Sequence, residues 1–253
     1  MSLLEISRDA GVLRVVLNDV RRRNALSADM LHELIDALDA AEADEDARVL
    51  VLSNRGSTFC AGADLREQSS APRAIGLDEL LGRLRASRLV SVGRLDGHCV
   101  AGGVGLAAAL DIAIAREDAT FGFSEVRLGL APAIISVVCL PKMREADARA
   151  AMLRGNRFDA TEAARIGLIS AAVPAQRLDE AVDEVLADLL AGEPHSLALT
   201  KQLIARVPSM SLEEAFAWTR TLSGELFASP AAREGMSAFL EKRAPSWAPS
   251  QPD

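Results

Sequence analysis

The first third of the chain alternates short β-rich runs with an amphipathic stretch. The runs Leu3–Ile6 and Val12–Leu17 predict a hairpin. Ser27 is a favourable N-cap, and the apolar residues after it recur every three or four positions, which is typical of an amphipathic helix. Arg48–Leu52 reads as a buried strand and Ser53–Asp64 as the loop that follows it. This order is the start of an α/β pattern.

The same pattern continues through the middle of the chain. Ser69–Arg73 is small and polar and is expected to be mobile, and Leu77–Leu89 has the spacing of an amphipathic helix. Leu89–Leu95 and Ile112–Ala115 are strand candidates on either side of a glycine-rich segment. Strands therefore alternate with helices, which favours an α/β fold with crossover connections. The order strand, strand, helix indicates a repeated structural unit without a repeat in sequence.

Beyond Pro132 the pattern becomes helical. Glycines and prolines separate the predicted helices, which are Pro141–Leu153, Thr161–Ile166, Leu178–Leu190, Leu197–Val207, Leu212–Phe227 and Ala231–Leu240. We therefore divide the chain into an α/β core, residues 1–190, and a C-terminal helical region, residues 191–253. The apolar face between Leu212 and Leu226 is larger than one short helix needs. It packs either across a subunit boundary or against its own core.

Composition excludes several classes of protein. With 28 Lys and Arg against 36 Asp and Glu, the net charge of −8 argues against a general affinity for nucleic acid or anionic membranes. The three cysteines form no C-x-x-C motif, which argues against a disulfide framework and a zinc site and for a reducing compartment. No apolar run approaches the roughly 20 residues of a membrane span, and the first residues do not resemble a secretory signal. We expect a soluble cytoplasmic protein.

Two small-residue segments and one acidic residue are the candidates for chemistry. Gly102 and Gly103 precede an Ala/Leu-rich run, so they predict a glycine turn that opens a helix and leaves main-chain N–H groups unpaired. Residues 61–63 form a second small-residue corner, and Glu125 lies about twenty residues beyond the first. Each feature also has an ordinary interpretation, as a tight turn, a turn after a strand, or the exposed position of a strand. Together, the amides suit an oxygen that gains negative charge, and the carboxylate suits proton transfer.

The basic and histidine residues give weaker signals. Three arginines at 21–23 are typical of a solvated turn, and they also suit a phosphate because guanidinium groups match its geometry. His98 lies beside the glycine turn, where it is either a loop residue or part of the chemistry. His32, His98 and His195 have no metal-ligand spacing, and no G-x-S-x-G occurs, so neither a metal site nor a serine triad is predicted.

Six segments, in order, resemble the enoyl-CoA hydratase/isomerase (crotonase) family across nearly the whole chain. Three lie in the first half: R-R-R-N-A-L-S at 21–27, F-C-A-G-A-D-L at 59–65 and G-H-C-V-A-G-G-V-G-L at 97–106. The others are F-G-F-S-E-V-R-L-G-L-A-P at 121–132, F-D-A-T-E-A-A-R-I-G-L-I at 158–169 and R-E-G-M-S-A-F-L-E-K-R at 233–243. The resemblance implies a spiral of strand–strand–helix units, followed by a helical region that builds trimers, often paired as hexamers.

The resemblance also implies an acyl-CoA thioester as the ligand, with coenzyme A as part of the substrate and no separate cofactor. Ala63 and Gly102 match the family's oxyanion hole, whose two amides hold the thioester oxygen as it becomes an enolate. The implied contacts to the CoA moiety are Arg21, Ala61, Asp64, Arg66 and Gly103, together with the C-terminal Phe239 and Lys242. Residues 67–84 and 131–138 are expected to line the acyl pocket.

One position departs from the family pattern. The hydratases of this family use two glutamates about twenty residues apart; the second matches Glu125, but the first falls on Gly105. Two carboxylates divide naturally the work of protonating Cα and activating water at Cβ, whereas Glu125 alone suits a proton shuttle from Cα to Cγ.

The chain also resembles a bacterial branch of hydratases and dehydratases of branched or glutaconyl-type CoA esters, which has glycine at that first position. In such a site a water could be held by Glu125 and the main chain together. We therefore predict an enoyl-CoA hydratase with Glu125 as acid/base. A Δ3-Δ2-enoyl-CoA isomerase and a catalytically weak acyl-CoA-binding member of the family are the alternatives.

Overall fold

The computed structural model describes residues 2–67 and 76–248, so the segment Ser69–Arg73 lies outside the described residues. The chain forms two compact units, which divide between Val185 and Leu186 inside helix α7 (Leu178–Ala191). The larger, N-terminal unit carries all the strands of the described residues, and the smaller unit is helical.

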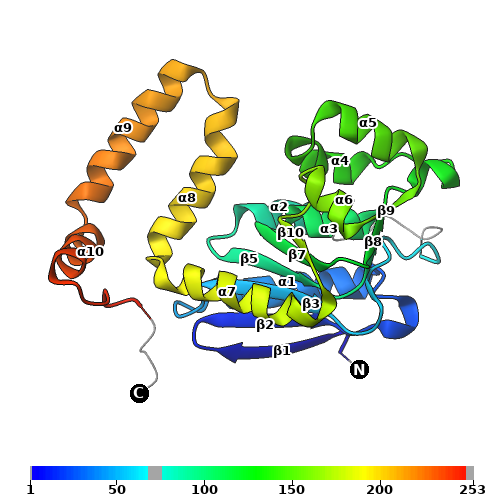
Figure 1. Cartoon of the computed structure of the whole chain (residues 1–253), viewed down its shortest axis with the longest axis horizontal. Coiled ribbons are helices and arrows are strands. Elements are labelled where there is room, and N and C mark those ends of the chain that lie inside the picture. Colours follow the sequence, from blue (N-terminus) through cyan, green and yellow to red (C-terminus); the bar gives the residue numbers. More distant parts are fainter. Residues whose placement is uncertain (1, 68–75, 249–253) are drawn as a thin grey trace. The chain divides into compact units, whose positions relative to one another are not determined.

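A six-stranded sheet forms the first layer of the N-terminal unit (Figure 1). Its order is β1 (Leu4–Asp9), β2 (Val12–Leu17), β3 (Val49–Asn54), β5 (Val90–Leu95), β7 (Ile112–Arg116) and β10 (Ala171–Val173). The first two strands pair antiparallel, which confirms the predicted hairpin, and every later pair is parallel. The central β3 is buried at all six positions, as expected for a strand covered on both faces.

A second, smaller sheet contains four strands of three residues each. These are β4 (Thr58–Cys60), β6 (His98–Val100), β8 (Thr120–Gly122) and β9 (Arg157–Asp159), in that order. The first three are parallel neighbours, whereas β9 runs antiparallel to β8. Each turn of the chain therefore places one strand in the large sheet, the next in the small sheet, and then a helix. This arrangement confirms the predicted α/β spiral of strand–strand–helix units.

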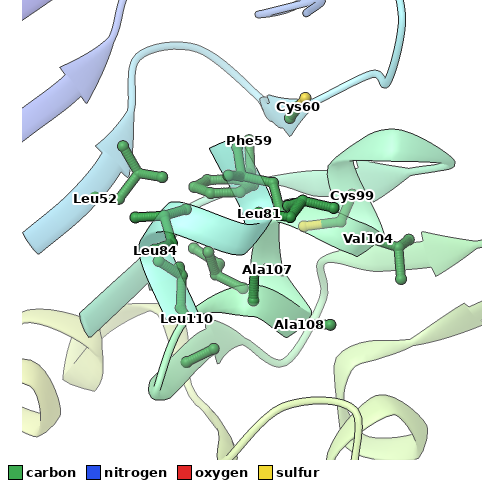
Figure 2. Close-up of a cluster of buried hydrophobic side chains, with 14 of the residues drawn as sticks. Leu52, Phe59, Cys60, Leu81, Leu84, Cys99, Val104, Ala107, Ala108 and Leu110 are labelled. Carbon is green, nitrogen blue, oxygen red and sulfur yellow. The ribbon is translucent and has the colours of Figure 1, made fainter. Parts of the chain in front are cut away.

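The helices of the spiral enclose the core. They are α1 (Ala28–Glu42), α2 (Leu77–Ala86), α3 (Gly102–Ala109) and α4 (Ala133–Cys139). Ser27 caps α1 as predicted, because its side chain accepts a hydrogen bond from the Met30 amide. Every residue of α3 is buried, since its small side chains let other elements approach from all sides. Figure 2 shows Phe59 of β4 beside Leu81 and Leu84 of α2, next to Ala107 of α3.

Three predicted elements need correction. Ser53–Asp64 is not only a loop, because Thr58–Cys60 pairs with β6; a three-residue strand is too short to show an alternating pattern. The helix predicted over Leu77–Leu89 ends at Ala86, where Ser87 turns to an extended conformation. The helix predicted over Pro141–Leu153 is broken at Met143, whose φ of −106° and ψ of 146° are extended.

Shorter elements complete the N-terminal unit. Before and after the break at Met143 lie η3 (Leu140–Lys142) and α5 (Glu145–Arg154). Helix α6 begins at Ala160, one residue before the predicted start, because the Asp159 side chain caps it by accepting from the Glu162 amide. The remaining one-turn helices are η1 (Val20–Arg22), η2 (Glu125–Leu128) and η4 (Ala175–Arg177).

The C-terminal unit contains α8 (Pro194–Arg206), η5 (Val207–Ser209), α9 (Leu212–Ala228) and α10 (Pro230–Glu241). Ser211 and Glu214 form a reciprocal capping box at the start of α9, which satisfies two otherwise unpaired amides. Leu212 and Phe216 on the predicted apolar face are 74% and 60% exposed. No helix in residues 2–67 and 76–248 has both the length and the hydropathy of a membrane span.

Candidate active site

Three consecutive turns of the spiral bring the predicted catalytic residues to one edge of the small sheet. Strands β4, β6 and β8 are parallel neighbours, so their carboxyl ends meet at the same edge. Ala63 follows the end of β4, Gly102 follows the end of β6 and begins α3, and Glu125 follows the end of β8 and begins η2. The topology therefore collects two amides and one carboxyl that are far apart in sequence.

The first two of these segments touch through their glycines. A Cβ on Gly62 would lie 2.9 Å from the amide nitrogen of Gly102 and 3.0 Å from the carbonyl oxygen of Val100. Gly62 also has a φ of +86°, a conformation that favours glycine. On the other side, the Ala101 amide donates to the Gly122 carbonyl at 2.9 Å and joins the ends of β6 and β8. The three segments are thus held against one another by main-chain contacts.

The amides of Ala63 and Gly102 have no acceptor in residues 2–67 and 76–248. Among the described residues, neither N–H group donates a hydrogen bond. The loop around Ala63 is nevertheless fixed, because the Leu26 amide donates to Gly62 at 2.8 Å and the Asp64 amide donates to Leu26 at 3.5 Å. Gly102 is the first residue of α3, where an amide has no partner within the helix. Two rigidly held donors with free N–H groups are what an oxyanion site requires.

Glu125 is a half-buried carboxyl at the start of η2. The alternative interpretation, in which Glu125 is the exposed position of a strand, is therefore wrong. Its Oε2 atom is buried and has no hydrogen-bond partner among the described residues. Burial raises the pKa of the Glu125 carboxyl, and a hydrogen bond from its own backbone amide offsets part of that rise. A carboxyl that binds a proton more readily than usual, with one oxygen free, is suited to act as an acid and a base.

Asn24 holds the segment that carries the Ala63 amide in place, although no motif in the sequence points to it. The residue is fully buried; its Nδ2 donates to the carbonyls of Arg55 at 3.1 Å and Thr58 at 2.8 Å, and its Oδ1 accepts from the Asp19 amide at 2.8 Å. These bonds join the segment before α1 to the start of β4, which leads into Ala63. The only sequence signal was an asparagine between the arginine run and the first helix.

A charged cluster surrounds Asp64, the residue after Ala63. Asp64 is buried, and its carboxylate lies 3.6 Å from the guanidinium of Arg22 and 3.9 Å from that of Arg66. Arg21 is the exposed neighbour in η1, and the Ala61 amide donates to the Arg23 carbonyl at 3.1 Å. The structure therefore gathers Arg21, Ala61, Asp64 and Arg66 in one neighbourhood, and it adds Arg22.

The other three predicted CoA contacts are placed differently. Gly103 packs tightly on β4, since a Cβ there would lie 2.1 Å from the Cys60 carbonyl oxygen. Phe239 is 82% exposed on α10, and Lys242 follows that helix in a left-handed conformation with a φ of 55°. Both belong to the C-terminal unit, so their part in binding stays a prediction.

Other candidate groups are already occupied. The Nδ1 atom of His98 lies 3.0 Å from both the amide and the hydroxyl of Thr120, which makes it a fixed part of the small sheet. A cavity of about 310 Å³ in the C-terminal unit is lined by Trp247 and mostly apolar neighbours. Its carboxylate, Glu193, caps α8 by accepting from the amides of His195 and Ser196.

Comparisons with known proteins give the family of the chain. A model of the family described as enoyl-CoA hydratase/isomerase matches residues 7–250. The chain is 31% identical to the 2,3-dehydroadipyl-CoA hydratase of Escherichia coli, covering 98% of this chain and 99% of that protein. It is 32% identical to the enoyl-CoA hydratase EchA19 of Mycobacterium tuberculosis, covering 96% and 95%.

A solved structure shows the same fold. The structure of AtuE from Pseudomonas aeruginosa superimposes with a TM-score of 0.91 at 33% identity, over 98% of this chain and all of that one. The strand–strand–helix spiral, the edge that collects Ala63, Gly102 and Glu125, and the match along almost the whole sequence lead to one assignment. The chain belongs to the enoyl-CoA hydratase/isomerase family and has the crotonase fold.

Proposed function

We propose that this protein is an enoyl-CoA hydratase, which adds water to a 2-enoyl-CoA thioester or removes it. The observation that carries the proposal is the meeting of two amides and one carboxyl at one sheet edge. The amides of Ala63 and Gly102 have no acceptor among the described residues, and the carboxyl is that of Glu125. The relatives named as hydratases support it. Coenzyme A enters as part of the substrate, and the chemistry uses no further cofactor.

The proposed chemistry divides between the main chain and one side chain. The amides of Ala63 and Gly102 donate to the thioester oxygen, which gains negative charge when water adds at Cβ and an enolate forms. Each such donor contributes roughly 3 kcal/mol to the transition state, by analogy with other oxyanion sites. Glu125 takes a proton from the attacking water and returns one to Cα, so the hydroxyl ends on Cβ and the hydrogen on Cα.

Isomerisation is the second candidate, and Gly105 favours it. Because Gly105 supplies no second carboxyl, Glu125 alone moves protons in this site. A single carboxyl suffices to remove a proton from Cα of a 3-enoyl thioester and to return it at Cγ, which moves the double bond into conjugation. The same two amides would stabilise the dienolate.

The binding of coenzyme A is proposed to use the cluster around Asp64. Arg22 and Arg66 lie on either side of its buried carboxylate and present their remaining N–H groups on an exposed loop. Guanidinium groups match phosphate oxygens in pairs, so this loop suits the phosphates of the CoA arm. Local basic residues thus explain how a chain of net charge −8 would bind a polyanion.

Two substrates and one variant test the proposal. Incubation with a 2-enoyl-CoA should give a product heavier by one water, whereas conversion of a 3-enoyl-CoA to its conjugated isomer without hydration would support the isomerase. Glu125→Gln should lose most turnover, roughly 100-fold or more, while still binding the ester. Turnover of neither ester, with binding intact, would leave the protein as an acyl-CoA-binding member of the family. Full activity of Glu125→Gln would remove Glu125 from the mechanism.

A homotrimer, or a hexamer of two trimers, is the proposed assembly. The C-terminal unit exposes large apolar side chains, which are Leu212, Phe216, Phe227, Phe239 and Leu240, each at least 60% accessible. Exposed apolar side chains gathered on one helical unit are typical of a subunit interface.

A further inference from the structure

Helices α3 and α4 are packed so closely at one point that position 105 has no room for a side chain. A Cβ on Gly105 would lie 2.2 Å from the Cγ2 atom of Ile135 and 2.7 Å from its Cβ. The Cα of Ile135 would be 3.5 Å away, an ordinary contact. The obstacle is therefore the isoleucine side chain and not the backbone of α4.

Ile135 belongs to a buried face of α4 that lies near the Glu125 carboxyl. Ile135 is 3% exposed, and Cys139, one helical turn later on the same face, is fully buried. Burial raises the pKa of the Cys139 thiol to about 12; Lys142 lowers it and the negative charge of Glu125 raises it further. The Cys139 thiol, one turn along α4 from Ile135, thus lies within electrostatic range of the Glu125 carboxyl.

Gly105 is also close to the proposed oxyanion site. It lies three residues after Gly102 in α3, so both residues share one face of the helix. A longer side chain at position 105 would start from this face, beside the free amide of Gly102 and toward Ile135. The volume that a side chain at position 105 would occupy therefore lies near the atoms that we propose to react.

We propose that Ile135 determines the reaction specificity of this site by filling the volume that a side chain from position 105 would take. This inference rests on the proposed function. Ile135 and Gly105 are then a complementary pair that leaves Glu125 as the single carboxyl and puts an apolar side chain in the volume that a second one would take. Ile135 acts through shape, and it takes no part in proton transfer.

Thermal unfolding tests the steric half of the proposal without any assay of turnover. Gly105→Ala should lower the Tm, because the new Cβ meets Ile135. In an Ile135→Gly background the same change should raise the Tm, since the obstacle is gone and alanine favours helix over glycine. Ile135→Ala is the matched control: its Cβ would still stand 2.7 Å from the new one, so it should not reverse the sign. If Gly105→Ala changed the Tm equally with isoleucine, alanine or glycine at position 135, the pairing would be overturned.

A second carboxyl tests the functional half. Gly105→Glu combined with Ile135→Gly should add a second ionisation to the pH profile of kcat/KM, and should raise the ratio of hydration to isomerisation at least tenfold. Gly105→Gln with Ile135→Gly has the same size without the charge, so its profile should keep one ionisation. Identical pH profiles of kcat/KM for the Glu and the Gln double variants would overturn the role of Ile135 in specificity. If the unaltered protein turns over neither ester, the proposed function fails, and the sign reversal of Tm still decides the steric pairing.

Discussion

Gly62 and Gly102 come from successive turns of the spiral and lie so close that no Cβ fits on Gly62. The hypothetical atom would stand 2.9 Å from the Gly102 amide nitrogen. This contact sets the separation between the two proposed oxyanion donors, because Ala63 follows directly after Gly62. The position of a proposed oxyanion donor thus depends on the absence of a side chain next to it.

Gly62→Ala should therefore damage both stability and turnover. The positive φ alone costs about 1 kcal/mol, and the contact with the Gly102 amide adds to it. Displacement of one oxyanion donor should lower kcat roughly 100-fold, with a smaller change in KM. Gly129→Ala is the control for stability, since Gly129 has a φ of +75° but no atom of the described residues lies within 4 Å of its hypothetical Cβ. Equal melting temperatures for the two variants would contradict the steric argument.

The raised pKa of Glu125 predicts a pH-dependent stability of definite sign. Because burial raises this pKa in the folded state, the folded protein keeps the proton at pH values where the unfolded chain has released it. The stability of the unaltered protein relative to Glu125→Gln should therefore be highest below the unfolded pKa. It should fall as the pH rises through the window up to the folded pKa.

Thermal melts of the two proteins from roughly pH 4 to pH 8 measure this difference. If the difference is constant with pH, the carboxyl is not perturbed by folding. The pH profile of kcat/KM should report the same group, with the active ionised form lost at a higher pH than for an exposed glutamate.

Asn24→Ala should destabilise the protein by about 3 kcal/mol, because it removes three hydrogen bonds between a fully buried side chain and the backbone. The loop that carries Ala63 should lose its support as well, so kcat should fall more than affinity for the ester. Asn18→Ala is a matched control: Asn18 is exposed, and its side chain donates to Glu5 at 2.9 Å. That change should alter stability by roughly 0.5 kcal/mol or less. Denaturant unfolding of both variants checks the prediction, which fails if the two losses are alike.

The exposed apolar side chains of the C-terminal unit predict that Phe216→Asp separates the subunits. Phe216 is 60% accessible in the single chain, and a charge buried at an interface is strongly unfavourable. Light scattering after size exclusion should give a trimer or hexamer for the unaltered protein and a smaller species for the variant. Ile6→Asp places the same charge on an exposed residue of β1 and should leave the mass unchanged. A monomer in the unaltered protein would reject the proposed assembly.

The sequence by itself determined the elements whose signal is local. The hairpin β1–β2, the buried strand β3 and the capped helix α1 follow from alternation, apolar runs and the Ser27 cap. The family followed as well, because six motifs stand in the family order along the chain. The glycine turn at Gly102 was also predicted, since a pair of glycines before an Ala/Leu-rich run carries its own conformational signal.

Only the tertiary structure decided which residues far apart in the sequence lie close together. Strands β4, β6 and β8 have three residues each, too few for a periodic pattern, and yet their parallel register brings Ala63, Gly102 and Glu125 to one edge. The support of Asn24 and the filling of the space at Gly105 by Ile135 join residues about thirty positions apart. Such contacts depend on how whole elements pack, and packing at a distance leaves no mark on the local pattern of polar and apolar residues.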